Sequence, residues 1–168
     1  MGGGERARGI SDQGAQVGMY FEDFEDGRNF VTGERLVTEA DVRTFADLSG
    51  DRNPIHLDPA AAVRAGFDGP VAHGALGLAV ATGLANQLEL TRGTLVALVG
   101  VSWRFRSPIR YGDRVRLHLR VASRRATANP ARGLVTLAVE LKNHHGDVVQ
   151  EGEFVELITR RTRLGEPS

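Results

Sequence analysis

The sequence predicts an α+β domain in which a curved antiparallel sheet wraps around one long apolar helix. Residues 74–88 are apolar on every side of a helical wheel, so other structure has to cover this helix. Several later segments place apolar side chains at every second position, as strands with one buried face do. The order of strand, helices and then four strands joined by short turns is typical of this class.

Length and composition favour one domain. The chain has 168 residues, of which 41% are hydrophobic and 25% charged, as in an ordinary soluble globular protein. Residues 1–17 and 160–168 are polar, glycine-rich or basic and lack an apolar period, which predicts mobile tails. We therefore expect a single domain over residues 18–159.

The charge balance excludes some classes of partner. Lys and Arg together number 21, as do Asp and Glu, so no overall field attracts nucleic acid or an anionic membrane. Cysteine is absent, which excludes disulfides and thiolate chemistry and favours a reducing compartment, so a cytoplasmic location is expected. Residues 1–9 lack the apolar segment of a secretory signal. Glycine and amide residues interrupt the uncharged residues 71–88, which predicts a buried helix instead of a membrane span.

The first elements have clear boundary signals. Residues 30–37 are predicted to form a strand. Thr38 followed by Asp41 resembles the capping box that opens a helix. The buried stripe of this helix is expected to contain Val42, Phe45, Ala46 and Leu48. Gly50 can adopt the left-handed conformation that ends a helix, so Asp51 begins a loop.

The loop that follows Gly50 is stiffened by proline. Pro54 pushes Asn53 toward extended geometry. Asp58 and Pro59 have the residue types of an N-cap and a first helical position, which predicts a short helix through Ala65. The loop is therefore expected to be fixed at both ends.

The second half of the chain is predicted to be strands. The first alternating set is Leu95, Ala97, Val99, Val101, Trp103 and Phe105. The next two are Val115, Leu117, Leu119 and Val121, and then Val135, Leu137, Val139 and Leu141. Residues 143–147 predict a turn, and a last strand, which alternates poorly, runs through residue 158.

Asp51 and His56 are the candidate catalytic residues. A carboxylate and an imidazole on a loop stiffened by proline can hold one water molecule between them and move its protons. The helix that begins at Gly74 offers free backbone N–H groups that would polarise a carbonyl group. Asn53 is expected to brace the loop through an Asx hydrogen bond. The same residue types also form purely structural turns, so spacing alone leaves both interpretations open.

Other polar residues carry weaker predictions. No metal site is predicted, because Asp58 suits a helix cap and a third neutral ligand is missing. His73 precedes the central helix, where it could contact a ligand, cap the helix or pack, and it is left outside the catalytic set. A basic region contains Arg104, Arg106, Arg110, Arg114 and Arg116. One or two of these could bind a phosphate, although alternation also predicts charges on a solvated strand face.

The residues around this loop resemble a known signature. Residues 49–56, Ser-Gly-Asp-Arg-Asn-Pro-Ile-His, are similar to the motif of the MaoC-type (R)-specific enoyl-CoA hydratases and acyl dehydratases. That motif contains a small residue, glycine, aspartate, any residue, asparagine, proline, an aliphatic residue and histidine. The match continues through Leu57, Asp58, Pro59 and Ala62 and then Gly69, Pro70, Val71, His73 and Gly74. The similarity covers most of residues 20–158, and its fixed order makes it specific.

The resemblance implies a hotdog fold, in which the sheet wraps the helix that begins at Gly74. It implies that Asp51 and His56 are the catalytic pair and that the Gly74 amide contacts the thioester carbonyl. Thr82 aligns with a helix serine in family members that act on short acyl chains, which implies support of the active-site loop. The implied reaction is reversible hydration of trans-2-enoyl-CoA to (R)-3-hydroxyacyl-CoA. Coenzyme A is then part of the substrate, and no further cofactor is expected.

The sequence leaves alternatives open for the activity, the substrate and the assembly. A hotdog thioesterase would hydrolyse the thioester, and a non-catalytic subunit would bind acyl-CoA without turnover. A branched or dicarboxylic acyl substrate is also compatible with the sequence. A homodimer or a dimer of dimers is expected, because such a sheet exposes an edge and a face that need cover. Acyl length and pathway are not determined, nor is which member of the pair acts first as base.

Overall fold

The computed structural model describes residues 18–161. Its elements are η1 (Phe21–Asp23), β1 (Asn29–Leu36), α1 (Glu39–Ser49), α2 (Pro54–Leu57), α3 (Pro59–Arg64), α4 (Gly74–Gln87), β2 (Leu95–Phe105), β3 (Arg114–Ala126), β4 (Arg132–Asn143) and β5 (Val148–Thr159). The predicted order of strand, helices and four strands is confirmed. Residues 1–17 and most of the predicted C-terminal tail lie outside the described residues. Arg160 and Arg161 are described, and they form ion pairs with Glu22 and Asp23.

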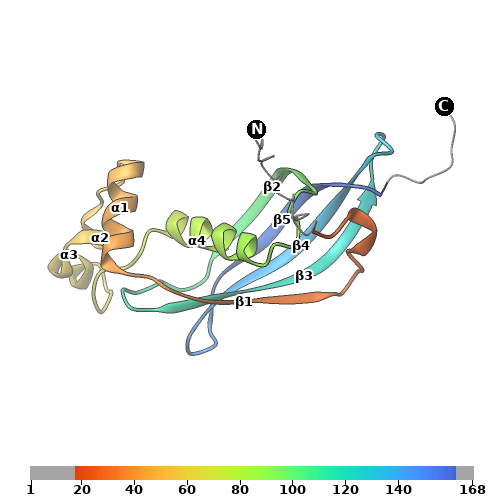
Figure 1. Ribbon diagram of the computed structural model, residues 1–168. Coiled ribbons are helices and arrows are strands. Elements are labelled where there is room, and N and C mark those ends of the chain that lie inside the picture. The colour runs from red at the N-terminus through yellow and green to blue at the C-terminus, as the bar shows by residue number, and fades with distance from the viewer. Residues whose placement is uncertain (1–17, 162–168) are drawn as a thin grey trace, which may run out of the picture.

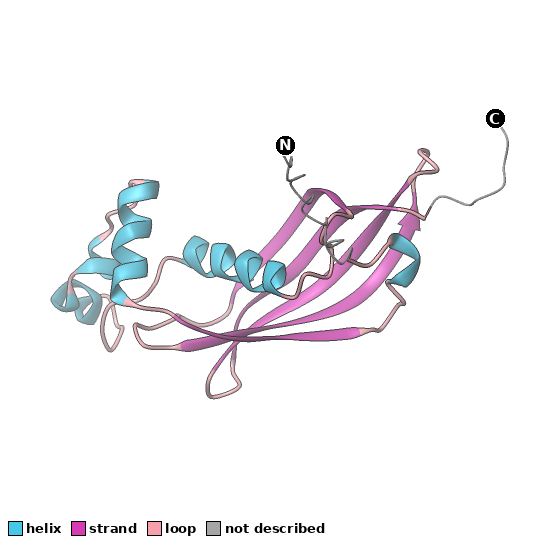
Figure 2. Ribbon diagram, viewed as in Figure 1, coloured by secondary structure: helices cyan, strands magenta, loops and turns pink. Residues whose placement is uncertain are grey.

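The five strands form one antiparallel sheet in the order β1-β3-β4-β5-β2, and α4 lies against one face of it (Figure 1). The pairs β3–β4 and β4–β5 are neighbours in both sequence and sheet, whereas β2 pairs only with β5 at one edge. The core lies between α4 and the sheet, and it includes Leu84, Leu117, Leu141 and Phe154. Figure 2 shows the short helices α1, α2 and α3 gathered beyond the first turn of α4.

The central helix is covered on one side only within this chain. Leu76, Ala81 and Leu84 are buried, whereas Ala79 and Thr82 are exposed. Within a single chain the sheet covers one side of this apolar helix, because a one-layer sheet can cover only one side of a cylinder. Among the described residues, no helix is long and apolar enough to cross a membrane.

Strand β2 departs from the predicted alternation. Its pairing with β5 shifts register twice, between Leu95 and Ala97 and between Leu98 and Gly100. These irregularities break the two-residue period, so the predicted single inward face is wrong. Exposed apolar side chains result, including Val99 and Val101. An edge strand with such side chains is a surface on which a second chain could add.

The predicted boundaries before the loop agree closely with the structure. Thr38 and Asp41 form the reciprocal hydrogen bonds of a capping box, and Gly50 ends α1 with φ of 77°. Asp58 caps α3 by accepting from the Ala60 amide. The unexpected element is α2, a single helical turn from Pro54 to Leu57 where the sequence predicted loop. The Ile55 amide donates to the Asn53 side-chain oxygen, and proline occupies the first position, which together explain this turn.

Candidate active site

The candidate site lies where the α1–α2 connection meets the start of α4. Asp51 belongs to that connection, His56 belongs to α2, and His73 is the residue immediately before α4. In Figure 1 the short helices stand next to the α4 end that begins with Gly74. The structure therefore brings together segments that are about twenty residues apart in sequence, as the hydrogen bond between the His73 ring and Asp51 records.

His56 is buried and held in one orientation. Its side chain is 10% exposed, and its Nδ1 lies 2.8 Å from the Val71 carbonyl oxygen. Because a carbonyl oxygen only accepts, Nδ1 carries the hydrogen, and in the neutral imidazole Nε2 presents a lone pair. The Tyr111 hydroxyl donates to the backbone carbonyl of His56 and holds this turn from the other side. The imidazole is thus fixed with its basic nitrogen turned toward Asp51.

Asp51 is more exposed and is shaped by its own turn. One carboxylate oxygen accepts from the Asn53 amide at 3.2 Å, while the other lies 4.0 Å from His56 Nε2. The side chain is 53% exposed, so water can reach it. The Asx bond predicted for Asn53 is present, since its side-chain oxygen accepts from the Ile55 amide at 3.2 Å. These two short-range bonds fix the backbone between the two candidate catalytic residues.

His73 links both candidate residues. Its Nε2 donates to the Asp51 carbonyl oxygen at 2.8 Å, and its ring lies against the His56 ring with centroids 3.8 Å apart. Phe45 of α1 packs on the His73 ring. His73 is 2% exposed, and its buried Nδ1 has no partner among the described residues. The bond to Asp51 and the stacking on His56 would allow His73 to position the pair.

The gap between the two side chains suits one small molecule with two donors. A distance of 4.0 Å is too long for a direct hydrogen bond. A carboxylate oxygen and an unprotonated imidazole nitrogen are both acceptors, so they do not satisfy each other. Water has two O–H groups and can donate one to each. The geometry therefore allows Asp51 and His56 to share a single water molecule and to receive its proton.

Gly74 is the first residue of α4, where backbone N–H groups have no partner within the helix. A Cβ placed on Gly74 would lie 2.7 Å from the Phe105 ring, so glycine permits this close approach. The buried Gln150 holds the turn, since its amide donates to the Gly74 carbonyl at 3.1 Å and accepts from the Trp103 indole. The free amide of a long helix is suited to stabilise a developing negative charge.

An open pocket of about 450 Å³ adjoins Gly74. Its walls include Val71, Ala72, Phe105, Arg106, Ile109 and Gln150. Asp51 and His56 are not among its lining residues, but Val71 connects the two sites because its carbonyl accepts from His56. A molecule bound in this pocket would thus lie beside the Gly74 amide and next to Val71, whose carbonyl holds His56.

Thr82 is not brought to the loop within one chain. Its exposed hydroxyl donates to the Ala79 carbonyl of its own helix at 2.8 Å. It lies eight residues after Gly74, which is about 12 Å along an α-helix. Support of the loop by Thr82 therefore stays a prediction.

Three of the five arginines in the predicted basic region are paired with carboxylates. Arg106 pairs with Glu151, Arg110 with Asp68, and Arg116 with Glu34. Of these three arginines, only Arg106 lines the pocket beside Gly74. The solvated-face interpretation thus accounts for most of this region, and Arg106 is the member best placed to meet a bound anion.

Three possible metal ligands come together in the structure. Asp51, His56 and His73 place ligand atoms within 4.8 Å of one another, so the third ligand that sequence reasoning found missing is present. Each imidazole also donates to a backbone carbonyl, as metal-bound histidines commonly do. The donor set is therefore compatible with a metal as well as with acid-base chemistry. The prediction that no metal is bound stays a prediction.

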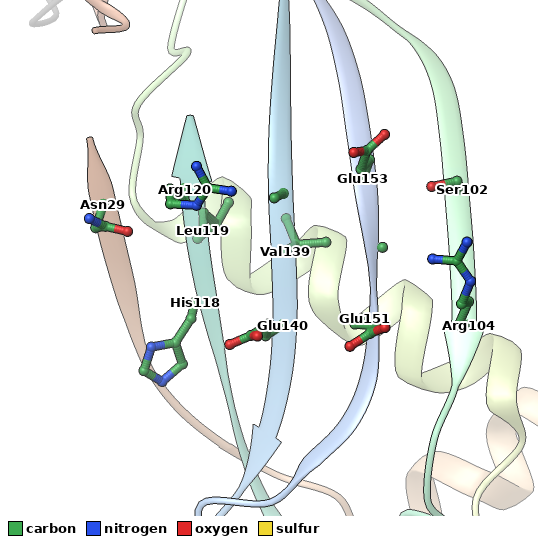
Figure 3. Close-up of a pocket in the computed structure, with 12 residues that line it drawn as sticks. Asn29, Ser102, Arg104, His118, Leu119, Arg120, Val139, Glu140, Glu151 and Glu153 are labelled. Atoms are coloured by element: carbon green, nitrogen blue, oxygen red, sulfur yellow. The ribbon is translucent and has the colours of Figure 1, made fainter. Parts of the chain in front are cut away.

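A second hollow of about 450 Å³ lies on the other face of the sheet (Figure 3). Its labelled side chains include His118 of β3, Glu140 of β4, Glu151 of β5 and Arg104 of β2, which point away from α4. Charges of both signs line it, and it is separated from Asp51 and His56 by the sheet. It is not part of the candidate active site.

Sequence reasoning missed the contributions of Tyr111 and Gln150. Each acts on a backbone carbonyl far away in sequence, at His56 and Gly74 respectively. One local signal was a polar residue, Gln150, at a buried position of a strand. Such contacts depend on how the strands are ordered, which residue spacing does not encode.

Comparison with known proteins identifies the family. The family described as "MaoC like domain" matches residues 23–143. The 3-hydroxybutyryl-CoA dehydratase of Methylorubrum extorquens is 33% identical over 146 residues, which covers 85% of this chain and 86% of that protein. An (R)-specific enoyl-CoA hydratase of Aeromonas caviae is 34% identical over 116 residues, covering 69% of this chain and 82% of the relative.

Solved structures agree in fold. The MaoC-like dehydratase of Rhodospirillum rubrum superposes with a TM-score of 0.76 at 28% identity, covering 86% of this chain and 99% of that one. A Mycobacterium tuberculosis protein described as having a double hotdog fold gives a TM-score of 0.76 at 21% identity, covering 90% of this chain and 47% of that one. The predicted hotdog fold is confirmed. The chain belongs to the MaoC-like family of dehydratases and hydratases.

Proposed function

We propose that this protein catalyses the reversible hydration of a trans-2-enoyl-CoA to the (R)-3-hydroxyacyl-CoA. The observation that carries the proposal is the pair of acceptors, Asp51 Oδ2 and His56 Nε2, held 4.0 Å apart beside the start of α4. The relatives named as a 3-hydroxybutyryl-CoA dehydratase and an (R)-specific enoyl-CoA hydratase support the same reaction run in either direction.

In the proposed reaction, water donates one hydrogen bond to each member of the pair. One member removes a proton as the water oxygen bonds to carbon 3 of the enoyl group. The electrons of the double bond move toward the thioester oxygen, and carbon 2 then receives the proton that was taken from the water. The dehydration direction reverses each step. Atoms balance without any oxidant or reductant, and either Asp51 or His56 can act first as base.

The Gly74 amide has the second role. It would donate to the thioester oxygen, on which negative charge develops as the water adds. The partial positive charge at the start of this 14-residue helix strengthens that contact. Asn53 and His73 would hold the Asp51 backbone in register with His56. We propose no cofactor or metal requirement, since these groups supply the proton transfers and the charge stabilisation.

The two rival functions are less well supported. In a thioesterase, water attacks the thioester carbon. Neither of the two relatives described for this chain is named as a thioesterase. A non-catalytic acyl-binding subunit would not need two acceptors held apart by fixed hydrogen bonds. A buried imidazole fixed by its other nitrogen is the usual arrangement of a working base.

The proposed ligand and assembly follow from two surfaces. Arg106 lines the pocket beside Gly74 and would contact a phosphate of coenzyme A by exchanging its Glu151 partner. Exposed apolar side chains along the edge strand β2 favour a homodimer formed through that edge, and they include Val99 and Val101. Further assembly into a dimer of dimers is left open by these features.

An assay with crotonyl-CoA tests the proposed reaction. We expect loss of enoyl absorbance and formation of (R)-3-hydroxybutyryl-CoA without free thiol, in buffer that contains EDTA. Release of thiol would instead show a thioesterase. Binding of acyl-CoA thioesters of several lengths without any turnover would show the non-catalytic alternative, and hydration abolished by EDTA would show a required metal.

His73→Phe is expected to lower kcat by about tenfold or more with little change in KM, because the ring contact to His56 stays but the bond that positions Asp51 is lost. His73→Gln should recover part of kcat, since its amide can donate to the same carbonyl. Steady-state kinetics and the pH profile of kcat measure both variants. Equal kcat in the two variants, or a loss confined to KM, would contradict the positioning role.

A further inference from the structure

Glu156 is a buried carboxyl group without a partner. It lies on β5 on the inner face of the sheet, 9% of the residue is exposed, and its Oε2 has no hydrogen-bond partner among the described residues. No described Lys, Arg or His forms an ion pair with it. Buried carboxylates are normally paired, because an unpaired buried charge is costly. Burial alone raises the pKa of this carboxyl to about 7.

Glu156 lines a pocket of about 180 Å³ near the end of α4. Most of the walls are apolar and include Leu95, Leu98, Leu137 and Phe154. The other polar side chains are Thr82, Asn86 and Thr91, all without formal charge. A partly open, mostly apolar pocket with one unsatisfied carboxyl is an arrangement by which binding pockets recognise a single polar group.

This pocket and the pocket at Gly74 lie along the same side of α4. The helix residues that line them, Gly74 and Ala75 in one and Thr82, Ala85 and Asn86 in the other, fall within about a third of the helix circumference. Both pockets are closed on the sheet side by residues of β2 and β5. Among the strands, α4 makes its main contacts with β1 and β3, so the side toward β2 and β5 is the less packed one.

The two pockets are separated along the helix axis. Thr82 is about 12 Å from Gly74 along α4. A thioester whose carbonyl is held at Gly74 would therefore meet Glu156 only with the far end of its acyl group. Resting on the proposed function, we propose that the Glu156 pocket receives the end of the acyl chain and selects chains that carry a hydroxyl group there.

A hydroxyl fits this carboxyl better than the other common donors. Near neutral pH both protonation states of Glu156 are populated, and a hydroxyl can donate to the carboxylate or accept from the protonated form. An ammonium group could pair only with the ionised form, and its burial among apolar walls would be costly. A methyl end would offer Glu156 Oε2 no hydrogen-bond partner.

The test uses trans-2-enoyl-CoA thioesters of increasing length, each prepared with a methyl or a hydroxyl end. At lengths that reach the pocket, wild-type protein should give a higher kcat/KM for the hydroxyl-ended chain. Glu156→Leu should shift the ratio of the two values toward the methyl-ended chain by about tenfold or more, because a buried hydroxyl would lose its partner. Glu156→Gln keeps a hydrogen-bonding group of the same shape and should retain most of the preference.

Glu153→Gln is the matched control, since Glu153 is three residues earlier on β5 and points away from α4 (Figure 3). It should leave the ratio unchanged. Selection by Glu156 would be overturned if wild-type protein showed no preference at any length, or if Glu156→Leu gave the wild-type ratio. Hydration of crotonyl-CoA would still leave the proposed function standing in that case. Failure of wild-type protein to hydrate every thioester would overturn both.

Discussion

Asp51→Asn and His56→Ala are each expected to lower kcat for crotonyl-CoA hydration by about a hundredfold or more, the range for loss of an acid-base group. Asp51→Asn removes a charge with almost no change of shape, so water loses one of its two acceptors. His56→Ala removes the other acceptor, Nε2, which lies 4.0 Å away. The measurement is steady-state kinetics with urea unfolding of each variant.

Exposed residues of the same types provide controls for this pair. Asp26→Asn and His145→Ala change an exposed carboxylate and an exposed imidazole, and both variants should keep the wild-type kcat. The double variant of Asp51 and His56 should lose little more than the worse single variant, since both act on one water molecule. Unchanged kcat in both single variants would remove the proposed mechanism.

The stability of the protein is expected to fall as pH rises from about 4.5 to 8, and Glu156 is the expected cause. Its pKa is about 7 in the folded protein against an ordinary value of 4.5, so the folded state binds the proton more tightly. The stabilisation is complete below the unfolded-state pKa and is lost as pH rises through the folded-state pKa. The shift corresponds to roughly 3 kcal/mol of unfolding free energy.

Glu156→Gln should abolish this part of the pH dependence, because the amide does not ionise. At pH 5 the free energy of unfolding should be close to that of the wild-type protein, and at pH 8.5 the variant should be the more stable. Urea unfolding at the two pH values, at one protein concentration, measures the difference. Glu153→Gln should keep the wild-type dependence. A wild-type profile that rises between pH 5 and 8.5 and is unaltered by Glu156→Gln would exclude the effect.

Much of the fold could be predicted because its signals are local. The capping box of Thr38 and Asp41, the left-handed Gly50 and the Asp58 cap each depend on residues within a few positions, and all are present. The strand positions followed from a two-residue period in β3 and β4. Strand β2 does not follow the two-residue period, since its bulges arise from pairing with a strand about fifty residues away.

The candidate catalytic pair was also expected from the sequence, because the loop resembles the MaoC-type motif, and short-range bonds shape the turn that carries Asp51 and His56. The residues that orient the pair were not. His73 reaches Asp51 across 22 positions, and Gln150 reaches Gly74 across 76. Sequence spacing contains no information about such contacts.

The sequence by itself determined the element order, the helix ends and the identity of the Asp51 and His56 loop, because hydrogen bonds and periodicity over a few residues decide them. Only the tertiary structure decided which nitrogen of His56 faces Asp51 and that one side of α4 is left uncovered. It also decided that Glu156 is buried with an oxygen that has no partner in residues 18–161. These features depend on the order of strands in the sheet and on long-range packing, which bring together groups that no local pattern relates.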